Sequence, residues 1–112
     1  MKRVLLLVAV ALLFPTLVAA EDWSNVSIID RHCADKEKAN VDAHTRDCAL
    51  MCSKSGYGVI DKDGNYLKFD AKGNEEATKL LQSSTQKDHL RVNVTGTKDG
   101  QMIHVQTLSM AS

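Results

Sequence analysis

The chain lacks a concentration of charge of either sign. Its 14 lysines and arginines balance 14 aspartates and glutamates, so the formal net charge is zero with neutral histidines. The lysines are spread between acidic residues, whereas nucleic acids and anionic membrane surfaces attract a clustered basic face. We therefore expect no nucleic-acid partner.

Long hydrophobic runs are also absent, apart from one at residues 4–14. Lys2 and Arg3 precede this run and small residues end at Ala20, a pattern typical of an export signal that is cleaved before Glu21. The run is too short for a comfortable membrane span, so we expect no stable membrane insertion. We predict that residues 1–20 are a signal peptide and that the mature protein is exported, either periplasmic or secreted.

Several motifs of redox, haem and calcium proteins are missing. No two cysteines have the C-x-x-C spacing, so neither a thioredoxin-type pair nor a C-x-x-C-H haem attachment motif is present. The acidic turn that begins at Asp61 has glycine fourth and lysine twelfth, where an EF-hand has glycine sixth and glutamate twelfth. No oxyanion-hole signature is present either, and we predict no catalytic residues and no enzymatic activity.

Removal of the signal would leave residues 21–112, with twelve basic and fourteen acidic side chains and a net charge of about −2. A chain of this length builds one core, and we expect a single domain without repeats. Domains of this size are only marginally stable, so a disulfide or a bound metal would contribute strongly to stability.

Alternating apolar and polar residues predict two β-hairpins. The first joins strands at 57–60 and 65–69 through an Asp-Gly turn, in which glycine adopts a positive φ at little cost. The second joins 90–95 to 103–106, and its turn contains Gly100. Together these hairpins supply four strands.

The segment before the first hairpin carries the cysteines. Residues 34–40 are polar and mostly charged, and we predict a surface loop there. Residues 41–55 are compatible with a helix closed by a glycine. His44, Cys48 and Cys52 recur every four residues, so in such a helix they would form a stripe on one face.

Two further elements complete the predicted fold. Residues 26–29 form a β-branched run that suits a first strand, and Asn74 is predicted to cap a short helix that ends near Ser83. Five short strands with one or two helices indicate a mainly β fold of the α+β class. We expect a small five-stranded OB-like barrel, because closure removes the exposed edges of an open sheet.

The sequence resembles a group of small exported bacterial proteins of largely unknown function. These proteins have a signal peptide, an Asp-x-x-Cys after the first strand, two further cysteines, a D-x-D-G-type hairpin and a closing V-x-V-T-G-T pair. The matching segments are Asp30-Arg31-His32-Cys33, Cys48 with Cys52, Lys54-Ser55-Gly56, Asp61-Lys62-Asp63-Gly64, and Val92-Asn93-Val94-Thr95-Gly96-Thr97 through Gly100, Ile103 and Val105. The resemblance implies export and a small barrel, and it names no substrate.

The main concentration of reactive side chains is the cluster of His32, Cys33, His44, Cys48 and Cys52. An exported protein meets an oxidising compartment, where thiols normally pair, yet three cysteines cannot all pair within one chain. One thiol is therefore left over, or all three bind a metal.

In the first interpretation, Cys33 forms a disulfide with Cys48 or with Cys52. Closing a loop of this length would stabilise the domain by about 3 kcal/mol in the chain-entropy model. A bridge between Cys48 and Cys52 is disfavoured, because one helical turn separates their Cβ atoms too far. The odd cysteine would be buried or would link two chains as a disulfide-bonded dimer.

In the second interpretation, Cys33, Cys48 and Cys52 bind Zn(II) or Cu(I), with His32 or His44 as the fourth ligand. In the third, a histidine beside one cysteine favours its thiolate and makes a redox-active thiol. We expect an exported, non-enzymatic binding or envelope-associated domain stapled by a disulfide, with metal binding and thiol redox chemistry as the alternatives.

Overall fold

Strand β1 (Glu21–Asp30) begins at the residue that follows the predicted cleavage position. The computed structural model describes residues 20–112, so the predicted signal peptide lies outside the described residues apart from Ala20. β1 pairs with β4 from its first residue onward, Glu21 with Gly96. β1 is longer than the predicted strand at 26–29.

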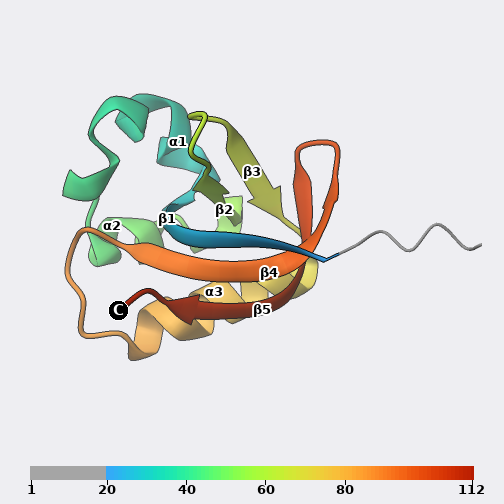
Figure 1. Cartoon of the computed structure of the whole chain (residues 1–112). Coiled ribbons are helices and arrows are strands. Elements are labelled where there is room, and N and C mark those ends of the chain that lie inside the picture. The colour runs from blue at the N-terminus through green and yellow to red at the C-terminus, as the bar shows by residue number, and fades with distance from the viewer. Residues whose placement is uncertain (1–19) are drawn as a thin grey trace, which may run out of the picture.

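Four further strands close the sheet into a barrel with β1 (Figure 1). They are β2 (Tyr57–Ile60), β3 (Tyr66–Phe69), β4 (Arg91–Asp99) and β5 (Met102–Met110). The order around the barrel is β1-β2-β3-β5-β4, in which only β3 and β5 pair in parallel and the other neighbours are antiparallel. The predicted mainly β, five-stranded OB-like barrel and both hairpins are confirmed.

The barrel interior is filled by the apolar residues of the alternating strands. In β3, Leu67 and Phe69 are buried, whereas Lys68 between them is exposed and Tyr66 is half-buried. The same alternation at the start of β4 and of β5 buries every second residue, Val92, Val94 and Gly96 in β4 and Ile103 and Val105 in β5. The buried apolar side chains of the strands are Trp23, Val26, Ile28, Ile29, Tyr57, Val59, Leu67, Phe69, Val92, Val94, Ile103 and Val105.

Two irregularities let long strands follow the curvature of the barrel. The pairing of β1 with β4 shifts between Trp23 and Val26, where Asn25 has a φ of 53°. The pairing of β4 with β5 shifts between Thr95 and Gly96. A Cβ atom at Gly96 would lie 2.2 Å from the carbonyl oxygen of His104, so this position requires glycine. Such bulges bend a strand and increase its twist.

Helix α3 (Ala71–Ser83) connects β3 to β4 and buries Ala77 and Leu81 against the barrel. Asp70 caps the helix by accepting a hydrogen bond from the backbone N–H of Gly73. The predicted cap, Asn74, was wrong: its side-chain oxygen accepts from the backbone N–H of Tyr57 instead, at 2.8 Å. Within residues 20–112, no helix is long and apolar enough to cross a membrane.

The connection between β1 and β2 folds into four short helical pieces that lie together at one end of the barrel (Figure 1). These are α1 (Arg31–Glu37), η1 (Lys38–Ala43), α2 (Arg46–Met51) and η2 (Ser53–Ser55). The predicted loop at 34–40 and the predicted single helix at 41–55 were therefore wrong.

Helix caps explain this difference. Thr45 has extended backbone angles and accepts a hydrogen bond from the backbone N–H of Cys48, which starts a new helix in the middle of the predicted one. His44 consequently precedes α2 and Cys52 follows it. The two residues do not share one helical face with Cys48, and the predicted stripe does not form.

Candidate functional site

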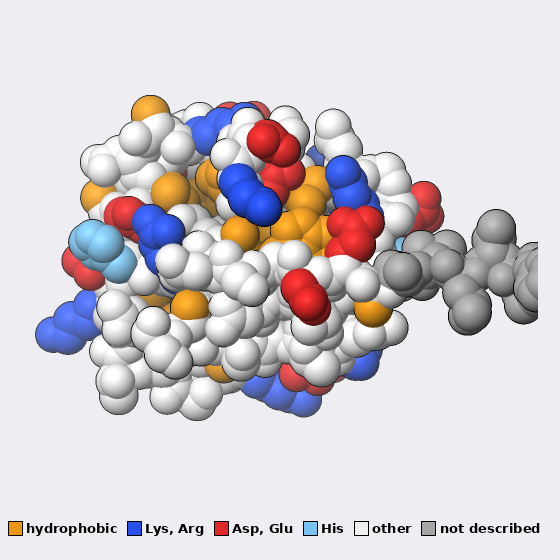
Figure 2. Space-filling view, in the orientation of Figure 1, with side chains coloured by type: hydrophobic (Ala, Val, Ile, Leu, Met, Phe, Trp, Pro, Cys, Tyr) orange, Lys and Arg blue, Asp and Glu red, His pale blue; other side chains and the backbone are white. Residues whose placement is uncertain are grey.

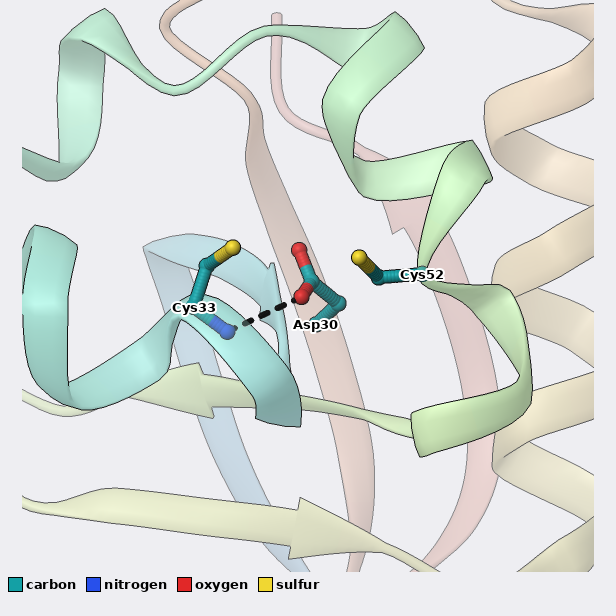
Figure 3. A group of neighbouring side chains, drawn as sticks. All are labelled: Asp30, Cys33 and Cys52. Carbon is teal, nitrogen blue, oxygen red and sulfur yellow. Dashed lines mark hydrogen bonds between the residues drawn. The ribbon is translucent and has the colours of Figure 1, made fainter.

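The carboxylate of Asp30 lies between the sulfur atoms of Cys33 and Cys52 (Figure 3). One carboxylate oxygen and the two sulfur atoms lie within 4.8 Å of one another. Asp30 is fully buried, and both cysteines are partly buried. We call these three residues the Asp30 cluster.

The end of β1 and the start of α1 position two members of the cluster. Asp30 is the last residue of β1 and also the N-cap of α1, where its Oδ2 atom accepts a hydrogen bond from the backbone N–H of Cys33 at 3.0 Å. An aspartate at this position satisfies an N–H group that the first helical turn leaves unpaired. The spacing of an N-cap and its third helical residue thus brings Cys33 to Asp30.

The end of α2 positions the third member. Cys52 is the C-cap of α2, and its backbone N–H donates to the carbonyl of Cys48. Its own carbonyl accepts a hydrogen bond from the Ser55 hydroxyl at 2.7 Å, within η2. The Ser55 hydroxyl oxygen also accepts from the backbone N–H of His32 at 3.2 Å, which ties η2 to α1. This tie holds Cys52 opposite Cys33.

His44 contacts the cluster through Asp30. Its Nε2 atom lies 2.7 Å from Oδ1 of Asp30, and both side chains are buried. With Asp30 ionised, Nε2 carries the shared proton and donates it, because a carboxylate only accepts. His44 therefore orients the Asp30 carboxylate and satisfies one of its oxygens, while the Cys33 backbone N–H satisfies the other.

The surroundings of Cys33 disfavour its thiolate. Burial, and then the negative charge of Asp30, raise the pKa of the Cys33 thiol from 9.0 to about 11. Both effects penalise an anion at the sulfur atom. At neutral pH Cys33 is therefore a protonated thiol.

The structure brings together only part of the predicted site. Cys33 and Cys52 are neighbours and His44 reaches them through Asp30, but Cys48 is exposed and is not part of the cluster. His32 is exposed as well. The prediction of a site built from all three cysteines with His32 or His44 is therefore corrected to the Asp30 cluster with His44 behind it.

Asp30 is the residue that sequence reasoning missed as a member of the site. The Asp-x-x-Cys pattern at the end of a β-branched run was available as a signal, because it places an N-cap carboxylate three residues before a thiol. All three cysteines lie in the described part of the chain, and all three are free thiols there. Between the two pairings predicted for Cys33, its proximity to Cys52 favours that partner over Cys48.

Comparison with known proteins finds no match to this chain among protein-family models, curated proteins or solved structures.

Proposed function

We propose that this protein is an exported, non-enzymatic barrel domain that binds a zinc ion through Asp30, Cys33 and Cys52, with His44 orienting Asp30. The observation that carries the proposal is the convergence of two sulfur atoms and one buried carboxylate oxygen within 4.8 Å. Thiolates and a carboxylate are established zinc ligands. The carboxylate favours Zn²⁺ over Cu⁺, because Cu⁺ prefers soft ligands.

The electrostatics of the cluster support a cation. Deprotonating Cys33 beside a buried carboxylate is unfavourable in the free protein, as its pKa of about 11 indicates. A divalent cation removes this penalty, since it neutralises the thiolates and the carboxylate together and releases the thiol protons. The hydrogen bond from His44 to Asp30 is the kind of outer contact that fixes a ligating carboxylate.

Three ligand atoms from the chain would leave a fourth position for water or another ligand. The described residues supply no fourth Cys, His, Asp or Glu ligand atom within the same distances. A site with three ligands from the chain keeps one position open for exchange, unlike the closed four-ligand sites of structural zinc. Metal storage, delivery or sensing is therefore the class of role that we propose.

A disulfide between Cys33 and Cys52 is the second candidate: both are free thiols in this structure, with sulfur atoms within 4.8 Å of each other. It would join the start of α1 to the end of α2 within the connection between β1 and β2, which we call the helical excursion. In the chain-entropy model this loop closure stabilises the fold by about 3 kcal/mol. The protein would then be a stapled binding or envelope-associated domain, with Cys48 as the odd thiol.

Neither candidate requires a redox-active thiol. Reactive cysteines have a lowered pKa beside a cationic group, whereas the Cys33 pKa is raised. The raised pKa of Cys33 therefore supports thiol redox chemistry less well than it supports zinc binding or a disulfide.

Native mass spectrometry of the mature protein, purified without reductant, tests the proposal. We expect one zinc ion per chain, and three alkylatable thiols once the protein is unfolded with a chelator. Cys33→Ser and Cys52→Ser should each abolish stoichiometric zinc. Cys48→Ser is the matched control and should retain it.

A mass lower by two hydrogens, with one alkylatable thiol at Cys48 and no zinc, would replace the zinc site with the Cys33–Cys52 disulfide. Three alkylatable thiols without zinc, even after addition of Zn²⁺ to reduced protein, would exclude both candidates.

A further inference from the structure

A surface cavity of about 350 Å³ lies on the outer side of β3, and none of its lining residues belongs to the Asp30 cluster. The parallel pairing of Lys68 with Met102 brings β3 beside the turn between β4 and β5, and the start of α1 forms the other wall. Figure 2 shows apolar surface over this strand with basic and acidic side chains around it. The lining residues are Arg31, Tyr66, Lys68, Asp99, Gln101 and Met102.

The two basic residues in the cavity have no acidic partner. Among residues 20–112, no carboxylate oxygen lies within 4.0 Å of the charged groups of Arg31 or Lys68. The one acidic lining residue, Asp99, lies 3.7 Å from Nε2 of His104. With Arg31 and Lys68 against Asp99, the charged lining residues leave one net positive charge in the cavity.

Tyr66 adds an unused hydrogen-bond donor. Its hydroxyl oxygen is buried and has no hydrogen-bond partner within the described chain. Buried hydroxyl groups are almost always paired, so a water molecule or a ligand from outside the chain completes the pairing of this one. Burial raises the pKa of this hydroxyl, and the positive charge of Arg31 opposes that effect, so the hydroxyl remains protonated and can donate.

The ring of Tyr66 lies over Gly58, which has no side chain to displace it. A Cβ atom at Gly58, on the adjacent strand, would lie 2.7 Å from Cζ of Tyr66. Only glycine leaves the space that the ring occupies over β2. The ring and the Met102 side chain supply apolar surface in the cavity, so the site offers both a cationic and an apolar part.

We propose that this cavity binds a small organic anion, in which a carboxylate or phosphate group on an apolar body contacts Arg31, Lys68 and the Tyr66 hydroxyl. A guanidinium group pairs with either oxyanion through two parallel hydrogen bonds, and the ammonium group of Lys68 adds a second charge. The apolar body of the ligand lies on the Tyr66 ring and Met102. The site shares no ligand atom with the proposed zinc site, so the two proposals can fail separately.

The test is a titration of ¹⁵N-labelled mature protein, followed by NMR, with benzoate and with phenyl phosphate. Benzylamine, which carries the opposite charge on a similar body, is the control. We expect saturable shifts of the backbone signals of Lys68, Gln101 and Met102 with one or both anions, and none with benzylamine. The anion that binds more tightly identifies the preferred oxyanion.

Substitutions connect binding to the named groups. Arg31→Gln and Lys68→Gln should each weaken the binding of the preferred anion at least tenfold, whereas Lys79→Gln removes the same charge from α3 and should not change it. Tyr66→Phe should weaken binding at least threefold. Asp99→Asn should tighten binding, because it removes the opposing charge from a cavity that stays otherwise intact.

Equal effects of the Arg31, Lys68 and Lys79 substitutions would overturn the proposal, as would binding of benzylamine at the same signals. Unchanged binding in a folded Tyr66→Phe variant would remove the hydroxyl from the site and overturn its assignment as a donor. An Asp99→Asn variant that binds no anion more tightly would argue against a charge-selected cavity.

Discussion

The Nε2 atom of His44 lies 2.7 Å from Oδ1 of Asp30, although thirteen residues separate the two in the sequence and both side chains are buried. Asp30 is the last residue of β1, and His44 lies just before Thr45, the N-cap of α2. Their hydrogen bond therefore fastens the helical excursion to the barrel. It also places a proton donor directly behind the carboxylate that faces Cys33 and Cys52.

Asp30→Asn should lower the free energy of unfolding by about 2–3 kcal/mol, because the amide oxygen accepts from only one of the two N–H donors that the Asp30 oxygens satisfy. Urea denaturation followed by circular dichroism measures the change. Asp47→Asn is the control, because the Asp47 side chain is 85% exposed and its ion pair lies at the surface. Equal stability of the two variants would contradict a structural role for the buried pair.

The reduced, metal-free protein should lose stability as the pH rises from about 9 to about 11. The pKa of Cys33 is raised from 9.0 to about 11 in the folded chain, so the unfolded chain releases this proton first. The stabilising contribution is complete below pH 9 and declines toward the folded pKa. Urea midpoints across this range, compared between Cys33→Ser and Cys48→Ser, measure the effect. The loss of stability between pH 9 and 11 should be smaller in Cys33→Ser than in Cys48→Ser. Identical pH profiles of the two variants would contradict the assignment of this loss to Cys33.

Tyr57→Phe should destabilise the protein by about 1–2 kcal/mol, because the buried hydroxyl of Tyr57 donates to the carbonyl of Ala49 at 2.8 Å. The substitution leaves that carbonyl without its donor. Tyr66→Phe removes an equally small group that has no partner among the described residues, and it should leave the stability unchanged or raise it. Thermal unfolding of both variants distinguishes the two hydroxyl groups. A larger loss for Tyr66→Phe would reverse this assignment.

Gly96→Ala should destabilise the barrel by about 2–3 kcal/mol, because the new Cβ atom would lie 2.2 Å from the carbonyl oxygen of His104. Gly100, in the turn of the same hairpin, has no atom within 4 Å of such a Cβ and a φ of 60°. Gly100→Ala should therefore cost only about 1 kcal/mol of backbone strain. The two midpoints in urea give the comparison, and an equal loss would mean that β4 adjusts to the added methyl group.

The mature chain should begin at Glu21 when the full sequence is expressed in a bacterial host. Export signals are cleaved after small residues such as Ala20. β1 also begins at Glu21, so cleavage there leaves the barrel intact. The intact mass of the periplasmic fraction measures the cleavage position. Retention of residues 1–20 in a cytoplasmic product would refute the predicted export.

The strands were predictable because each carries local information. In β4 and β5 the apolar residues alternate with polar ones, and a period of two identifies both the strand and its buried face. The helical excursion between β1 and β2 was not predictable in the same way. Its helices have six or seven residues, and caps at Asp30 and Thr45 outweigh the four-residue spacing of His44, Cys48 and Cys52.

Alternation and turn residues, by themselves, determined the mainly β class, the two hairpins and the presence of thiols near the end of the first strand. Only the tertiary structure decided which of those thiols meet. Barrel closure and the fold of the helical excursion place Cys52 opposite Cys33, leave Cys48 exposed, and bury Asp30 between the two sulfur atoms. The reason is physical: a strand pattern depends on neighbouring residues, whereas a site depends on contacts between elements that lie far apart in the chain.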